Sequence, residues 1–74
     1  MTIHEYTAVI HSDVTGSYWA DVPALPGCAS QGETISETLE NIKGAIADYL
    51  AVLREDGDVI PEDAPIIRKV TVAV

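Results

Sequence analysis

The fold is decided by residues 18–37, which read YWADVPALPGCASQGETISE. This stretch opens on a strand-forming run at residues 18–22, breaks at two prolines and a glycine, and resumes as a second short run at residues 28–31. It closes on Thr34-Ile35-Ser36-Glu37, a capping box in which the Thr34 hydroxyl accepts a hydrogen bond from the amide of Glu37. The stretch therefore predicts two strands joined by a tight loop and followed at once by a helix.

Apolar residues recur every three or four positions after this cap, which is typical of one helical face packed on a core. They are Ile35, Leu39, Ile42, Ile46, Tyr49, Leu50 and Leu53. Gly57 lies where a left-handed residue ends a helix, and Pro61 and Pro65 prevent the helix from resuming. We expect one helix between Thr34 and Gly57.

The flanking sequence supplies two more strands. Residues 3–11 alternate with a period of two and predict a strand paired with residues 18–22, across a turn in which Gly16 takes a positive φ. Residues 66–74 also alternate and predict a fourth strand, reached by a right-handed crossover. We therefore expect residues 1–74 to form one α+β domain of order β-β-β-α-β. It would be a three-stranded antiparallel meander with a fourth strand parallel to the first and one helix on one face.

One helix covers only one face of such a sheet. The alternation assigns the following residues to the uncovered face: Thr7, Val9, His11, Trp19, Thr71 and Ala73. Exposed apolar patches often mark interaction surfaces, and tryptophan is enriched among the residues that dominate binding energy. The alternative is that Trp19 merely packs against its own sheet edge.

Charge and cysteine content restrict the partners and the compartment. The 74 residues carry 12 acids against 4 Lys and Arg, a formal net charge of −8. This excess of acids argues against direct DNA binding, because DNA-binding proteins neutralise phosphates with lysine and arginine side chains. It is compatible with a basic partner protein, or with a charge that only keeps the protein soluble. A single cysteine predicts a reducing cytoplasm, and we expect neither a targeting signal nor a membrane span.

The sequence predicts no catalytic, cofactor or metal site. Cys28 follows a Pro-Gly turn, where a small buried hydrophobe is the usual role. His4 and His11 fall on opposite faces of the first strand and so do not converge on one ion. Asp13 lies in a predicted turn and Asp21 in a predicted strand, and neither belongs to a basic or metal-binding motif in the sequence. We therefore interpret both as solvent-exposed acids. We expect the protein not to be an enzyme.

Residues 18–34 resemble the signature of the HicB antitoxin family, roughly Tyr-x-Ala-x-x-Pro-x-x-Pro-Gly-Cys followed by Gly-x-Thr and a Glu-containing helix. The resemblance runs from about Tyr6 to Gly57, with Thr38 and Gly44 as departures from the family pattern. It implies a degenerate ribonuclease-H-like fold without catalytic acids. It also implies a small, basic, RNA-cleaving HicA-like toxin as the partner in a type II toxin–antitoxin system, and assembly into dimers or tetramers.

Relatives in this family often add a C-terminal DNA-binding domain, and because the sequence stops at Val74 we expect no direct DNA binding. The motif positions expected to contact the partner are Tyr18, Trp19, Asp21, Leu25 and Pro26. Two alternatives remain open. One is a metal-dependent nuclease of the ribonuclease-H type that uses Asp13 or Asp21, and the other is a domain that only assembles with itself.

Overall fold

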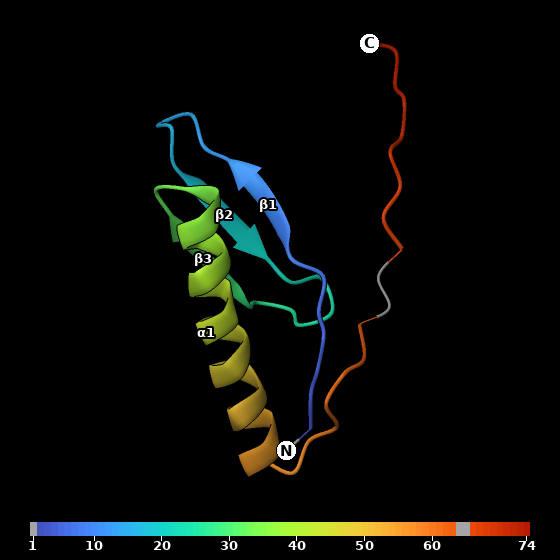
Figure 1. Cartoon of the computed structure of the whole chain (residues 1–74). Coiled ribbons are helices and arrows are strands. Elements are labelled where there is room, and N and C mark those ends of the chain that lie inside the picture. Colours follow the sequence, from blue (N-terminus) through green and yellow to red (C-terminus); the bar gives the residue numbers. More distant parts are fainter. Residues whose placement is uncertain (1, 64–65) are drawn as a thin grey trace.

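Along the chain, three strands that form one sheet are followed by one helix. The computed structural model describes residues 2–63 and 66–74. Strands β1 (Val9–Ser12), β2 (Tyr18–Asp21) and β3 (Ala29–Gly32) form an antiparallel sheet in the order β1-β2-β3, and helix α1 (Ile35–Glu55) follows (Figure 1). The α+β class and the antiparallel meander are confirmed.

Both ends of α1 are capped as predicted. At the start, Thr34 is extended (φ −132°, ψ 163°) and its Oγ1 accepts a hydrogen bond from the Glu37 amide at 3.0 Å. At the end, Gly57 has a φ of 71°, and the amides of Gly57 and Asp58 donate to the carbonyls of Arg54 and Leu53 at 3.2 and 2.9 Å. This pair of bonds is a Schellman motif, which satisfies carbonyls that the last helical turn leaves free.

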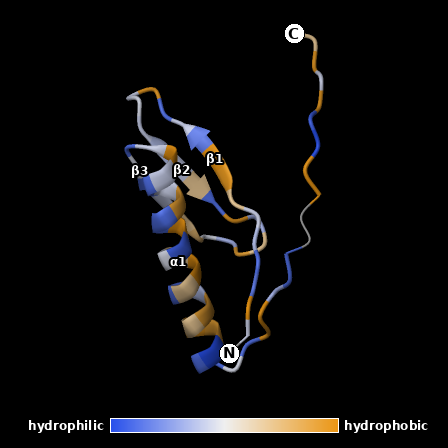
Figure 2. Cartoon of the chain, viewed as in Figure 1, coloured by the Kyte–Doolittle hydropathy of each residue, from blue (hydrophilic) through white to orange (hydrophobic). Residues whose placement is uncertain are grey.

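The apolar side of α1 faces β2 and β3, as the hydropathy colours show (Figure 2). Ile42 and Leu50 are buried as predicted, but Ile35 and Leu39, near the start of the helix, are 49% and 40% exposed. Thr38 is fully buried instead, with its hydroxyl donating to the Thr34 carbonyl at 2.8 Å. The predicted apolar stripe is therefore correct along most of the helix and wrong near its start.

A close contact between α1 and β3 explains why Thr38 is buried at the start of the helix while Ile35 and Leu39 are exposed. A Cβ added to Gly32 would lie 2.7 Å from the backbone nitrogen of Thr38 and 2.8 Å from its Oγ1. The helix thus approaches the strand across a glycine, with Thr38 toward the sheet. The Asn41 side-chain amide fastens the same contact by donating to the Gln31 carbonyl at 2.7 Å.

The loop between β2 and β3 consists of two successive β-turns. The amide of Leu25 donates to the Val22 carbonyl at 2.9 Å, and the amide of Cys28 donates to the Leu25 carbonyl at 3.0 Å. The second turn has Pro26 at its first central position and Gly27, with a φ of 83°, at its second, as a type II turn requires. The amide of Val22 then donates to the Cys28 carbonyl at 3.1 Å and closes the loop.

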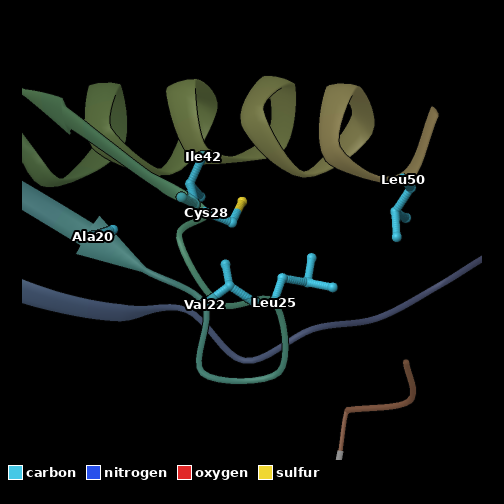
Figure 3. Close-up of a cluster of buried hydrophobic side chains, with 6 residues drawn as sticks. All are labelled: Ala20, Val22, Leu25, Cys28, Ile42 and Leu50. Carbon is cyan, nitrogen blue, oxygen red and sulfur yellow. The ribbon is translucent and has the colours of Figure 1, made fainter. Parts of the chain in front are cut away.

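These turns place the hydrophobic core between the loop, the sheet and the helix (Figure 3). Its buried members are Ala20, Val22, Leu25, Cys28, Ile42 and Leu50. Three of the six come from the seven-residue loop segment 22–28, so the proline-rich motif is first of all a core-forming element.

The predicted fourth strand is not confirmed. Residues 66–74 run extended and exposed away from the sheet, and no strand is assigned within them (Figure 1). The ribonuclease-H-like arrangement, which needs that strand, is likewise not confirmed. The segment just before it does lie beside the N-terminal residues, because the Tyr6 hydroxyl donates to the Pro61 carbonyl and Thr7 Oγ1 donates to Asp63 Oδ2 at 2.8 Å.

The environment of Tyr6 reflects this contact. Partial burial raises the pKa of the Tyr6 hydroxyl above its usual value, and the negative charges of Asp63 and Glu62 raise it further. The hydroxyl therefore stays protonated, and remains a hydrogen-bond donor to Pro61, over the whole neutral range.

Gly44 offers a simple test of how α1 contributes to stability. It lies on the exposed side of the helix, and a Cβ added there meets nothing within 4 Å. Because glycine in a helix interior costs about 1 kcal/mol relative to alanine, we expect Gly44→Ala to raise the free energy of unfolding by about 0.5–1 kcal/mol. Urea unfolding followed by circular dichroism measures this, and an unchanged or lower midpoint would contradict it.

Candidate protein-binding surface

The face of the sheet opposite α1 is the surface that the helix leaves uncovered. In the register, His11 lies opposite Trp19, and Val9 lies opposite Asp21. Ala20, which points the other way from Trp19 along β2, is fully buried on the helix side. The predicted positions of Val9, His11 and Trp19 on the uncovered face are therefore confirmed, whereas Thr71 and Ala73 do not join the sheet.

Three side chains on this face form a connected group, which we call the open-face cluster: His11, Trp19 and Asp21. The His11 ring stacks on the Trp19 ring, with centroids 3.9 Å apart and planes inclined by 17°. His11 Nε2 lies 2.8 Å from Asp21 Oδ1, so the imidazole N–H donates to the carboxylate. Stacking on one side and a hydrogen bond on the other restrict the His11 rotamer.

The cluster is accessible as well as ordered. Trp19 is 41% exposed, and the side chains of His11 and Asp21 are 39% and 41% exposed. A shallow hollow lies beside Trp19 and is lined by Ala29, Ser30 and Gln31 of β3. The surface thus offers a partner a flat aromatic group, a carboxylate and a polar amide within one patch.

The other predicted contact residues do not gather in this patch. Tyr18 alternates with Trp19 and lies half-buried on the helix side of β2. Leu25 is fully buried in the core. Pro26 is exposed on the loop, where its carbonyl accepts a hydrogen bond from the Tyr49 hydroxyl at 3.0 Å. The structure therefore unites Trp19 and Asp21 and separates them from the remaining three positions.

His11 is the member of the cluster that the motif did not predict as a contact. Alternation along the first strand placed it on the uncovered face, but its bond to Asp21 depends on the register between β1 and β2. A shift of one residue between the two strands would place the His11 and Asp21 side chains on opposite faces of the sheet and break this bond.

The second histidine and the cysteine lie outside the open-face cluster. Within residues 2–63 and 66–74, no group of three or more His, Cys, Asp or Glu side chains is placed to hold a metal ion. His4 stacks on Tyr6, with centroids 6.3 Å apart. Cys28 is buried, and burial raises the pKa of its thiol, which keeps it protonated.

No helix among the described residues is long and apolar enough to cross a membrane.

Comparison with known proteins assigns the family. Residues 6–72 match the sequence model of the HicB-like antitoxin of bacterial toxin–antitoxin systems. The chain belongs to the HicB-like antitoxin family. The matched region contains all three strands, the helix, the open-face cluster and most of the extended segment 66–74.

Individual relatives agree with this assignment. The UPF0150 protein Ta0767 of Thermoplasma acidophilum is 48% identical over 59 residues, which cover 80% of this chain and 86% of the relative. The UPF0150 protein ssr1765 of Synechocystis is 33% identical over 72 residues, covering 97% and 91%. A UPF0150 protein of Archaeoglobus fulgidus is 41% identical over 58 residues, covering 76% and 84%.

Proposed function

We propose that this HicB-like antitoxin is a non-catalytic cytoplasmic protein that binds a small, basic, RNA-cleaving toxin of the HicA type and covers its RNA-binding surface. Family membership supports a toxin as the partner. We choose the open-face cluster as the toxin-binding surface because its stacked and hydrogen-bonded side chains lie exposed on the face of the sheet that α1 does not cover.

The chemistry of the cluster suits such a partner. A half-exposed tryptophan offers a large apolar area with little conformational freedom to lose. Asp21, held by His11, adds an acceptor for a lysine or arginine of the toxin. The net charge of −8 attracts a basic protein over a longer range and competes with RNA phosphates for the same surface.

The proposed contact surface is thus His11, Trp19, Asp21 and the neighbouring Gln31. Tyr18 on the helix side of β2 and Pro26 on the loop lie apart from this face. Leu25 is left out of it. Because that side chain is fully buried, its role in the motif is to hold the loop in shape.

Replacement of Trp19 is the direct test. We expect Trp19→Ala to weaken the complex with a small basic toxin of the HicA type by at least about thirtyfold, the effect of removing a binding hot spot of about 2 kcal/mol. Isothermal titration calorimetry measures the affinity, and co-expression measures whether growth is still rescued from the toxin.

Val52→Ala is the matched control for this experiment. Val52 is an exposed apolar residue on α1, where it lines a different hollow together with Cys28 and Tyr49. We expect its replacement to leave the affinity unchanged. If Val52→Ala weakens the complex and Trp19→Ala does not, the toxin binds the helix side and the proposed surface is wrong.

A cleavage assay tests the non-catalytic part of the proposal. Purified protein incubated with labelled RNA and Mg²⁺ should leave the RNA intact, because Asp21 is engaged by His11 and no metal-binding group surrounds it in the described residues. Cleavage that Asp21→Asn abolishes would establish a nuclease instead.

A further inference from the structure

The side of Trp19 that faces β3 borders a hollow with an open aromatic wall. The register places His11, Trp19 and Gln31 in one row across the three strands, on the face that α1 does not cover. From β1, the His11 ring stacks on the indole, with centroids 3.9 Å apart. Toward β3, the hollow is lined by Trp19 together with Ala29, Ser30 and Gln31. One face of the indole is therefore covered by His11, and the other face borders the hollow.

The floor of this hollow is an alanine, and hydrogen-bond acceptors stand beside it. Ala29 is exposed and lies directly opposite Asp21 in the register, so the two side chains are neighbours across the strands. His11 binds Asp21 through Oδ1 at 2.8 Å, which leaves the second carboxylate oxygen to accept a hydrogen bond from a partner. Gln31 is also exposed and offers its side-chain amide oxygen from β3.

The charge around the hollow is negative. Residues 1–42, which contain all three strands, carry six acids and neither lysine nor arginine. The four bases of the chain lie on α1, at Lys43 and Arg54, and at residues 68 and 69. A nucleobase could stack on the indole as well, but its phosphates would find no lysine or arginine on the sheet. The hollow therefore favours a cation as its occupant.

The shape and the acceptors of the hollow distinguish arginine from lysine. A guanidinium group is planar, so it lies flat on an aromatic ring while its N–H donors point outward to acceptors in its own plane. It also pairs well with a carboxylate. A lysine ammonium group has no flat surface to stack and is more strongly hydrated. An aromatic face with a carboxylate and an amide oxygen beside it is thus better matched to arginine.

We propose that an arginine side chain of the basic partner enters this hollow, stacks on the free face of Trp19 and donates hydrogen bonds to Asp21 and Gln31. The inference rests on the proposed function and deepens it, because it names the kind of partner residue that the open-face cluster binds. His11 is then a positioning residue, since it supports the indole from the opposite face and holds the Asp21 carboxylate in place.

An experiment without the toxin tests the hollow itself. Trp19 is the only tryptophan of the chain, so its indole N–H gives a single signal in a nitrogen-15 NMR spectrum. The probes are two blocked tripeptides of equal charge, Gly-Arg-Gly and Gly-Lys-Gly, each acetylated and amidated. We expect the arginine peptide to shift the indole signal with at least about fivefold higher affinity than the lysine peptide.

A variant that fills the hollow should remove this binding. Ala29→Leu occupies the floor and leaves the stacked rings and the bond from His11 to Asp21 in place, and we expect it to weaken binding of the arginine peptide at least about fivefold. Ala47→Leu is the matched control, because Ala47 is an exposed alanine on α1, and it should bind as wild type does. Asp21→Asn is the second variant, since it removes the charge but keeps the side-chain volume, and it should also weaken binding. Helical circular dichroism verifies that each variant is folded.

Three results would overturn the proposal. The first is equal affinity for the two peptides, and the second is an Ala29→Leu protein that binds the arginine peptide as tightly as wild type. The third is a uridine tetranucleotide that shifts the indole signal at lower concentration than the arginine peptide does, because the hollow would then bind a nucleobase.

Toxin binding by Ala29→Leu is measured in parallel by calorimetry, so that the two proposals fail separately. If the arginine peptide binds wild type selectively and the toxin does not bind, the proposed function is wrong and the arginine site stands. If the toxin binds and Trp19→Ala weakens it while the two peptides bind equally, the arginine site is wrong and the proposed function stands.

Discussion

Leu25→Ala should lower the free energy of unfolding by about 2–5 kcal/mol, the range for emptying a fully buried leucine site. Leu25 is fully buried where the loop, the sheet and the helix meet (Figure 3). A domain of this size has about 4–11 kcal/mol of stability in total, so this single change removes a large share of it. We expect the thermal midpoint to fall by more than about 10 °C, measured by circular dichroism.

Leu39→Ala is the control for this prediction, because it makes the same chemical change at a site that is 40% exposed. It should cost less than about 1 kcal/mol. Suppose that Leu25→Ala leaves the thermal unfolding midpoint unchanged and only weakens the complex with the toxin. Leu25 would then be a contact residue, and the role of this motif position would be binding and not core packing.

Gly32→Ala should destabilise the protein by about 1–3 kcal/mol through overpacking. The new Cβ would lie 2.7 Å from the Thr38 backbone nitrogen, so α1 has to move away from β3. That movement stretches the Asn41–Gln31 hydrogen bond and loosens the packing under Ile42. Denaturant unfolding measures the cost.

The same glycine-to-alanine change at Gly44 has the opposite expected sign, which makes the two variants a matched pair. Adding Thr38→Ala to Gly32→Ala should recover only part of the loss, since it removes the Oγ1 contact but leaves the backbone contact in place. A Gly32→Ala protein as stable as wild type would show that the strand and the helix are not in close contact here.

Local signals in the sequence predicted the local structure well. The cap at Thr34, the left-handed Gly57 and the turn glycine Gly16 depend on neighbouring residues only, and the structure has all three. Period-two alternation was enough to place Trp19 and His11 on the uncovered face.

Features that depend on distant contacts were not predictable in the same way. The burial of Thr38 follows from the approach of the helix to Gly32, and a threonine on a polar side of the helical pattern gives no sign of it. The bond from His11 to Asp21 follows from strand register. Residues 66–74 have a strand-like sequence, but whether they pair depends on where an edge is available, which alternation does not encode.

Cys28 shows a further consequence of the double turn between β2 and β3. The only thiol of the chain is buried beneath that loop, and burial raises its pKa. Because the thiolate is the reactive form, the folded protein resists oxidation and disulfide exchange. We expect a thiol reagent to modify Cys28 more slowly in the native protein than in the unfolded chain, so the rate of labelling measures how well the folded loop protects this thiol.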